Sequence, residues 1–374
     1  VAELPIPSML PSRSGFIWFG TWFGLFRYDG YALKEYMPTA YWDGKPVNAY
    51  KISCLFEDKD GLLWIGLYTG GIFRFDPVTG QSRVHQTRKN DATSLSDNTV
   101  HCIAQDRNGK IWVGTKQGLN CLDPASGRVQ RIIADPGTPG ALQNNQIRSL
   151  CVSRDGSLWV GTYRGVARVQ ITPGSFSVSR HYILTPPGEE TPTGVESPHD
   201  FIFTIREDSH TNGLFWIGTK GGLKRLDTNQ PSLSAGLVHF RARPGGLSDN
   251  FVETILETAE GPNQILWIGT YNGLCRLEVA TGAFTTFLPE KGNPASLKDN
   301  VVISLAADQT GLIWAGTNKG VNKINPEPKP FRHLSFGSSH ENNLWALAGN
   351  SKNGTEIWAG SAGGGLKHIV ARGK

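Results

Sequence analysis

The sequence has no uninterrupted apolar stretch close to the roughly 20 residues that a membrane-spanning helix requires. It also lacks the apolar core of a signal peptide, and no segment keeps the 3.6-residue apolar period of an amphipathic helix. Charged residues are few, at 18%, and the net charge of +5 is spread along the chain instead of forming one basic stripe. These absences exclude a membrane span within the chain, disfavour nucleic-acid binding and predict few helices. We therefore expect either that the protein is cytosolic or that the chain is a processed or excised segment of a longer protein.

Paired cysteines are missing as well. The five cysteines are an odd number, none forms a CxxC motif, and no paired histidines lie near them in sequence. Neither a zinc site nor a complete disulfide framework is therefore indicated. We expect no metal and no cofactor, and we interpret the thiols as buried and free: Cys54, Cys102, Cys121, Cys151 and Cys275.

Glycine and tryptophan are abundant, with 45 and 11 residues, and the tryptophans mark an internal repeat. The element W-x-G recurs at eight positions that are spaced 44 to 57 residues apart. Repeats of this length, built from short apolar runs and glycine turns, are typical of β-propeller blades. The repeated tryptophans are Trp18, Trp64, Trp112, Trp159, Trp216, Trp267, Trp314 and Trp358.

One repeat shows how each unit is expected to fold. Residues 100–104 and 111–115 predict a first and a second strand with a turn between them, and a glycine hairpin leads to a third strand at 119–123. A further turn leads to a fourth strand at 128–133. The sequence therefore predicts an all-β protein, a β-propeller of four-stranded antiparallel blades.

The number of blades depends on how the ends of the chain join. The first unit contains second, third and fourth strands, and the last contains first, second and third strands, so they overlap and cannot be two halves of one blade. We expect a single propeller domain over residues 1–374 with eight blades, in which residues 1–10 could supply the outer strand of the last. Seven blades plus a separate unit is the alternative.

The repeat also resembles a known family. The string [IL]-W-[IV]-G-T-x-x-G-L-x-R-[FLY]-D at residues 17–29 and 111–123, with related forms at 216–227 and 267–278, is similar to the two-component regulator propeller repeat. The resemblance implies a periplasmic or extracellular sensor segment of a bacterial hybrid two-component protein that responds to oligosaccharides. Membrane attachment and kinase output would then belong to segments absent from this chain.

Candidate ligand contacts lie on one face. In a propeller, the hairpins between second and third strands lie beside the loops that lead into the first strands, and such loops commonly bind ligands. Aromatic rings stack on sugars, and Lys and Arg pair with carboxylates or sulfates. The alternative is that these residues only form exposed turns. The hairpin candidates are Trp22, Tyr68, Lys116, Tyr163, Arg164, Lys220 and Tyr271.

A second set comes from a variable position inside each first strand, which is expected to point toward the central channel. His101 and Arg148 are its ligand-binding candidates, and the other members are Ser53, Phe203, Glu253, Ile303 and Trp345. In addition, the stretch 37–49 is expected to bring Tyr41 and Trp42 beside Trp22, which predicts a sugar-binding subsite.

The favoured function is a non-catalytic, oligosaccharide-sensing propeller, with a homodimer through the propeller as one arrangement. A propeller-fold polysaccharide lyase or glycoside hydrolase is the alternative. Lyase chemistry would need a base such as His101, Tyr163 or Tyr271 beside a cation such as Arg148 or Arg164. Hydrolysis would need two facing carboxylates, and Glu253 has no partner at an equivalent position. A protein-interaction scaffold is the third interpretation.

Overall fold

The computed structural model describes residues 3–136, 138, 141–172, 175–186, 188–189, 197–326, 344–349, 356–361 and 365–370. The chain divides into two compact units, Val1–Pro326 and Glu327–Lys374, and each is described by itself. The prediction of one domain over residues 1–374 stays a prediction. Helix is scarce, as expected: the described part contains the 3₁₀ turn η1 (Pro198–Asp200) and the short helix α1 (Leu233–Gly236), and none of its helices could cross a bilayer.

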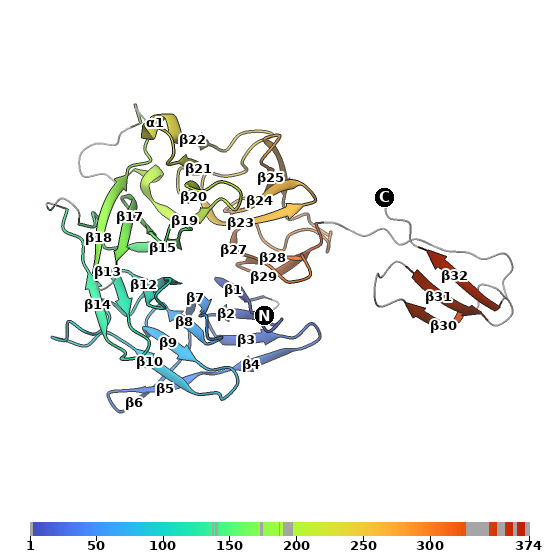
Figure 1. Cartoon of the computed structure of the whole chain (residues 1–374), viewed down its shortest axis with the longest axis horizontal. Helices are drawn as coiled ribbons and strands as arrows, with labels where there is room; N and C mark the ends of the chain where they lie inside the picture. Colours follow the sequence, from blue (N-terminus) through green and yellow to red (C-terminus); the bar gives the residue numbers. More distant parts are fainter. Residues whose placement is uncertain are drawn as a thin grey trace. The chain divides into compact units, whose positions relative to one another are not determined.

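The first unit is a β-propeller whose blades are separate antiparallel sheets (Figure 1). Blades 1 to 3 comprise β1 (Ser8–Pro11), β2 (Ile17–Thr21), β3 (Gly24–Tyr28) and β4 (Leu33–Tyr36); β7 (Ile52–Glu57), β8 (Leu63–Leu67), β9 (Ile72–Phe75) and β10 (Ser82–His85); and β11 (Val100–Gln105), β12 (Ile111–Thr115), β13 (Gly118–Leu122) and β14 (Val129–Ile132). An additional hairpin, β5 (Thr39–Trp42) and β6 (Lys45–Asn48), leaves the propeller between blades 1 and 2.

Blades 4 to 6 repeat the four-stranded pattern. They comprise β15 (Ile147–Val152), β16 (Leu158–Thr162), β17 (Gly165–Thr172) and β18 (Ser175–Tyr182); β19 (Ile202–Glu207), β20 (Leu214–Thr219), β21 (Gly222–Asp227) and β22 (Leu237–Phe240); and β23 (Val252–Glu260), β24 (Asn263–Thr270), β25 (Gly273–Glu278) and β26 (Ala283–Phe287). Blade 7 has three strands within the described residues: β27 (Val302–Ala307), β28 (Ile313–Thr317) and β29 (Gly320–Ile324).

The propeller closes with seven blades, so the alternative is confirmed and the expected eight-bladed ring is wrong. The inner strand β1 lies between β27 and β7, which completes the ring. The Ile6 amide donates to the Thr317 carbonyl at 3.1 Å, and the Ser304 hydroxyl donates to the Ile6 carbonyl at 2.6 Å. The expectation that residues 1–10 supply an outer strand is also wrong. Residues 8–11 form the inner strand of the first unit, which is therefore a complete blade.

The eighth repeat lies in the second unit. Its described strands, β30 (Leu344–Gly349), β31 (Glu356–Ser361) and β32 (Gly365–Val370), form one antiparallel sheet. Trp358 is 40% exposed within it. The side chain of Trp345, one of the residues expected to face the channel, lies outside the described residues.

The repeated W-x-G element builds the core between blades. The second strands are buried along their whole length in blades 1 to 4, and the second-strand tryptophans of blades 1 to 6 are at most 1% exposed. The glycine permits close approach of the next blade: a Cβ on Gly114 would lie 2.7 Å from Ile147 of blade 4. The repeated glycine therefore allows neighbouring blades to pack closely, and any larger residue at position 114 would push two blades apart.

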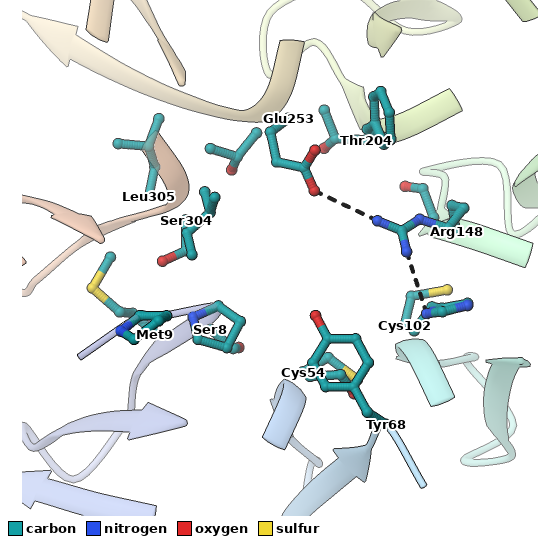
Figure 2. A pocket seen from close by; sticks show the side chains of 18 of the residues that line it. Ser8, Met9, Cys54, Tyr68, Cys102, Arg148, Thr204, Glu253, Ser304 and Leu305 are labelled. Atoms are coloured by element: carbon teal, nitrogen blue, oxygen red, sulfur yellow. Dashed lines mark hydrogen bonds and ion pairs between the residues drawn. The ribbon is translucent and has the colours of Figure 1, made fainter. Parts of the chain in front are cut away.

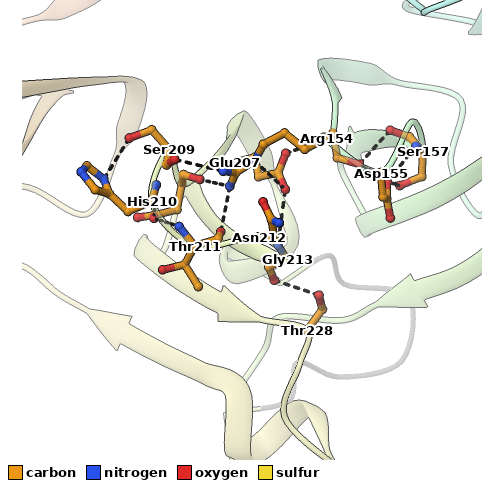
Figure 3. A network of polar contacts seen from close by, with 12 residues as sticks. Arg154, Asp155, Ser157, Glu207, Ser209, His210, Thr211, Asn212, Gly213 and Thr228 are labelled. Atoms are coloured by element: carbon orange, nitrogen blue, oxygen red, sulfur yellow. Dashed lines mark hydrogen bonds and ion pairs between the residues drawn. The ribbon is translucent and has the colours of Figure 1, made fainter.

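Polar bridges connect the turns between first and second strands of neighbouring blades. Arg154, in the turn between β15 and β16, donates to the carbonyls of Ser209 and Thr211 of blade 5 at 3.0 and 2.9 Å (Figure 3). Its amide donates to Glu207 at 2.7 Å. At the closure, Gln309 donates to the carbonyls of Ser12 and Arg13. These bridges stabilise the end of the propeller opposite the hairpin candidates.

Candidate functional site

The hairpin candidates lie at one end of the blades, as expected. In blade 3, Val100 at the start of β11 pairs with Thr115 at the end of β12, so the β12–β13 hairpin lies beside the loop that leads into the inner strand. The same register recurs in blades 2 and 4 to 7. We call this end of the propeller the hairpin face.

A cavity of about 580 Å³ lies inside the ring of inner strands (Figure 2). The variable inner-strand position contributes to its wall from six blades. Five of the predicted ligand-binding residues line it: Trp22, Tyr68, His101, Arg148 and Tyr271. Ser53, Phe203, Glu253 and Ile303 line it as well.

Arg148 is the central charged group of this cavity. Its Nη2 lies 3.5 Å from Oε1 of Glu253 on β23, two blades away, and its Nη1 lies 3.4 Å from Nδ1 of His101 on β11 (Figure 2). The guanidinium also lies 5.7 Å from the ring centre of Phe203. One arginine therefore links inner strands of three blades, and the ion pair leaves the cavity close to electrically neutral.

Burial sets the protonation of the groups around Arg148. Burial raises the pKa of Glu253, and the nearby guanidinium offsets part of this rise. Burial and then the charge of Arg148 lower the pKa of His101 to about 4. His101 is therefore neutral at pH 7 and can accept a hydrogen bond from Arg148, but it is a weak base.

Two tyrosines and a tryptophan complete the cavity on the hairpin side. Burial raises the pKa of Tyr68 and of Tyr271, so both phenols stay protonated at neutral pH and can donate hydrogen bonds. Trp22 meets Tyr68 edge to face, with ring centres 6.4 Å apart. Since Trp22 is 51% exposed, one ring is open to solvent beside the cavity.

An aromatic arc, made of Tyr163, Phe201, Phe251 and Tyr271, borders the hairpin face over blades 4 to 6. Tyr163 stacks on Phe201 at 4.4 Å and Phe251 stacks on Tyr271 at 4.9 Å. Lys220 joins the two pairs, because its ammonium lies 5.3 and 5.4 Å from the Phe201 and Phe251 ring centres. The arc thus presents apolar edges together with one cation.

Sequence reasoning missed Phe201 and Phe251. Each directly precedes an inner strand and follows an Asp or Asn, in D-F-I and N-F-V. An aromatic residue at that position in two neighbouring repeats was the signal that could have found them, since the loops into inner strands share a face with the hairpins.

The predicted subsite of Trp22, Tyr41 and Trp42 is not assembled. Trp42 lines a separate pocket of about 240 Å³ beside β10, where Arg88 lies 4.7 Å from its ring centre and also pairs with Asp43. Tyr41 is 72% exposed on β5. The reason is that β5 packs against β10, the outer strand of blade 2.

The remaining candidates, Lys116, Tyr163, Arg164 and Lys220, lie on the hairpins and do not line the cavity. Cys54 and Cys102 do line it, but burial raises the pKa of Cys54 to about 12 and that of Cys102 above its ordinary value. Neither is a thiolate at neutral pH. No group of three or more potential metal ligands occurs within the part of the chain that the structure describes.

Two family models match parts of the chain. Residues 296–319 match the two component regulator propeller, and residues 53–179 match the SMP-30/gluconolactonase/LRE-like region. The resemblance in the sequence is thus confirmed. Among curated proteins, no sequence matches the chain.

Solved structures share the fold. The extracellular domain of a hybrid two component system from B. thetaiotaomicron is 22% identical, with a TM-score of 0.66 over 99% of this chain and 46% of that domain. Virginiamycin B lyase from Staphylococcus aureus is 15% identical, with a TM-score of 0.56 over 86% of this chain and 94% of the lyase. PorZ, a surface component of the type-IX secretion system of Porphyromonas gingivalis, is 18% identical, with a TM-score of 0.58 over 95% of this chain and 50% of PorZ. The chain spans less than half of the length of that two component extracellular domain.

Proposed function

We propose that this regulator propeller is the ligand-binding sensor segment of a bacterial signal-transduction receptor, placed in the periplasm or outside the cell, and that it binds an oligosaccharide without turnover. The observation that carries the proposal is the cavity of about 580 Å³, which opens beside the exposed ring of Trp22. Aromatic rings beside phenol, guanidinium and carboxylate groups match the alternating apolar and hydroxyl-bearing faces of a sugar. The extracellular domain with the same fold supports the location.

Protonation favours binding over catalysis. A lyase base must take a proton at neutral pH, but His101 has a pKa of about 4 and burial raises the pKa of Tyr271. Both therefore act as hydrogen-bond partners. The likeness to virginiamycin B lyase and the SMP-30/gluconolactonase match make an enzyme the second candidate, which the same experiment tests.

The test is calorimetry with a panel of neutral and uronic-acid oligosaccharides, together with the absorbance of unsaturated products. Binding without an absorbance rise supports a sensor, and an absorbance rise would establish a lyase. Trp22→Ala should weaken binding about tenfold or more, because a stacking ring is lost. Tyr31→Ala is the matched control: Tyr31 is 98% exposed and lies in the β3–β4 turn, at the opposite end of blade 1.

Binding would be transmitted through a change of assembly. We include in the proposal a homodimer formed through the propeller and membrane attachment through segments outside this chain. Light scattering with and without the bound glycan measures whether the protein is a dimer. A mass that stays monomeric in both states would remove the dimer from the proposal, and a panel without any binding glycan would favour the protein-interaction scaffold.

A further inference from the structure

The hairpins of the hairpin face carry charge of only one sign. The seven turns between second and third strands, at 21–24, 67–71, 115–118, 162–165, 219–222, 270–273 and 317–320, contain no Asp or Glu. They contain four basic residues, and all four are exposed. These are Lys116, Arg164, Lys220 and Lys319.

Four acidic residues of the adjoining loops accept hydrogen bonds from backbone amides of the chain. Asp97, Asp249 and Asp299 accept hydrogen bonds from the backbone amides two residues on, at 2.6, 2.7 and 3.0 Å. Asp200 is buried and accepts from the Leu184 amide at 2.6 Å. Lys319 pairs with Asp299 at 2.9 Å, which leaves the other three hairpin cations unmatched by a described salt bridge.

The cations lie close enough to act on a ligand at the cavity. The charge of Lys116 is among the causes that lower the pKa of His101 on the cavity wall. Lys220 is held over Phe201 and Phe251 of the aromatic arc, whose last member, Tyr271, also lines the cavity. Inside, Arg148 is matched by Glu253, so the wall itself adds no net repulsion toward an anion.

Resting on the proposed function, we propose that the oligosaccharide is acidic, with carboxylate or sulfate groups that pair with Lys116 and Lys220 while its rings contact the cavity and the aromatic arc. Cations at a concave site raise the local concentration of anionic ligands and speed their association. Lys116 and Lys220 come from blades 3 and 5, so the recognised chain carries at least two anionic groups separated along its length. A single acidic sugar would engage one cation and bind more weakly.

The experiment compares oligogalacturonate, its fully methyl-esterified form and a sulfated tetrasaccharide by calorimetry at low and at physiological ionic strength. We expect at least one acidic probe to bind about tenfold more tightly than the ester at low ionic strength, with a smaller ratio as salt screens the charges. The acidic probe whose affinity exceeds that of the ester shows whether the protein recognises carboxylate or sulfate groups. Lys116→Gln combined with Lys220→Gln should weaken binding of the acidic probe about tenfold more than binding of the ester.

The control is Lys59→Gln, because Lys59 is exposed in the β7–β8 turn at the opposite end of blade 2 and should leave all affinities unchanged. Lys116→Gln alone repeats the test without disturbing the aromatic arc. Equal binding of the ester and both acidic probes, or full affinity in the double variant, would overturn this inference and leave the proposed function standing. Loss of binding for every glycan in the panel would instead reject the proposed function.

Discussion

Arg148 and Glu253 face each other within the ring of inner strands, with Nη2 of the guanidinium 3.5 Å from Oε1 of the carboxylate. They belong to blades 4 and 6, so the pair joins blades that are not neighbours. Each side chain is about one-fifth exposed, at 22% and 18%, and a ligand that enters the cavity meets both. A ligand in the cavity therefore contacts this ion pair.

Replacing Arg148 should change the titration of its partner. Burial raises the pKa of Glu253 and Arg148 lowers it, so Arg148→Met removes the opposing cause and the pKa should rise further. Carbon-13 NMR of labelled glutamate carboxyls measures the shift. Arg83→Met, on the exposed side of β10, should leave the titration unchanged. An unaltered Glu253 titration in Arg148→Met would show that the pair is not coupled in solution.

Substitutions of the two tryptophans of blade 1 should have different effects, with Trp18 contributing to stability and Trp22 to ligand binding. Trp18 is 1% exposed and packs against Tyr36 and Phe75, whereas Trp22 is 51% exposed. Trp18→Ala should lower the free energy of unfolding by about 3–5 kcal/mol, as large core truncations do. Trp22→Ala should change it by less than about 1 kcal/mol, because no packed core is lost. Urea denaturation compares them, and equal losses would contradict the assignment.

The fold could be predicted from the sequence because each repeat contains its own local signals. Trp112, Gly114 and the hairpin glycine Gly118 recur at fixed spacing, and they determine one blade almost without reference to the others. Closure could not be predicted in this way. It depends on whether Ile6 meets Ser304 and Thr317, a contact between residues almost 300 positions apart that no local pattern encodes.

The candidate site, like the fold, could be predicted only in part from the sequence. Strand alternation placed His101 and Arg148 in the cavity, because side chains at every second position share one face of a strand. Strand alternation could not show that Arg148 pairs with Glu253, because this ion pair depends on how the ring of inner strands curves. The sequence did not show that β5 and β6 pair as a hairpin beside β10, where Trp42 lines a separate pocket.

Acid should destabilise the propeller through three buried histidines. Burial, followed by nearby cations, lowers the pKa of His85, His101 and His239 to about 4. The unfolded chain, with ordinary pKa values near 6.5, therefore binds more protons between pH 4 and 6.5. Stability falls as the pH decreases through that window. Melting temperatures measured at closely spaced pH values should show it, and a constant melting temperature across the window would contradict these assignments.

One cluster in blade 5 contributes to this pH dependence. The ammonium of Lys224 is fully buried and lies 3.0 Å from Nδ1 of His199 and 2.6 Å from Nδ1 of His239. Lys224→Met should raise the pKa of His239, because the charge of Lys224 is the second cause, after burial, that lowers it. The melting temperature of this variant should therefore fall less steeply below pH 6.5. Lys59→Met, in the exposed β7–β8 turn of blade 2, should keep the wild-type slope.

Blade 4 lacks a hydrogen bond that four other blades share. In blades 2, 3, 5 and 7 the indole N–H of the core tryptophan donates to an Asp carboxylate, as from Trp112 to Asp106 at 2.8 Å. In blade 4, Ser153 replaces this Asp, and its hydroxyl bonds instead to Asp155 and Ser157. The buried Nε1 of Trp159 has no hydrogen-bond partner among the described residues. A buried N–H left in this way costs about 1–3 kcal/mol.

Ser153→Asp should therefore stabilise the propeller, because a carboxylate at this position can accept from Trp159 as Asp106 does from Trp112. We expect the free energy of unfolding to rise by about 1 kcal/mol. The reverse change, Asp106→Ser, recreates the blade 4 arrangement in blade 3 and should lower the free energy of unfolding by about 1–3 kcal/mol. Urea denaturation of both variants checks the pair. If Ser153→Asp proved neutral while Asp106→Ser was destabilising, Trp159 would already have an acceptor in solution, and its indole would not be a source of instability.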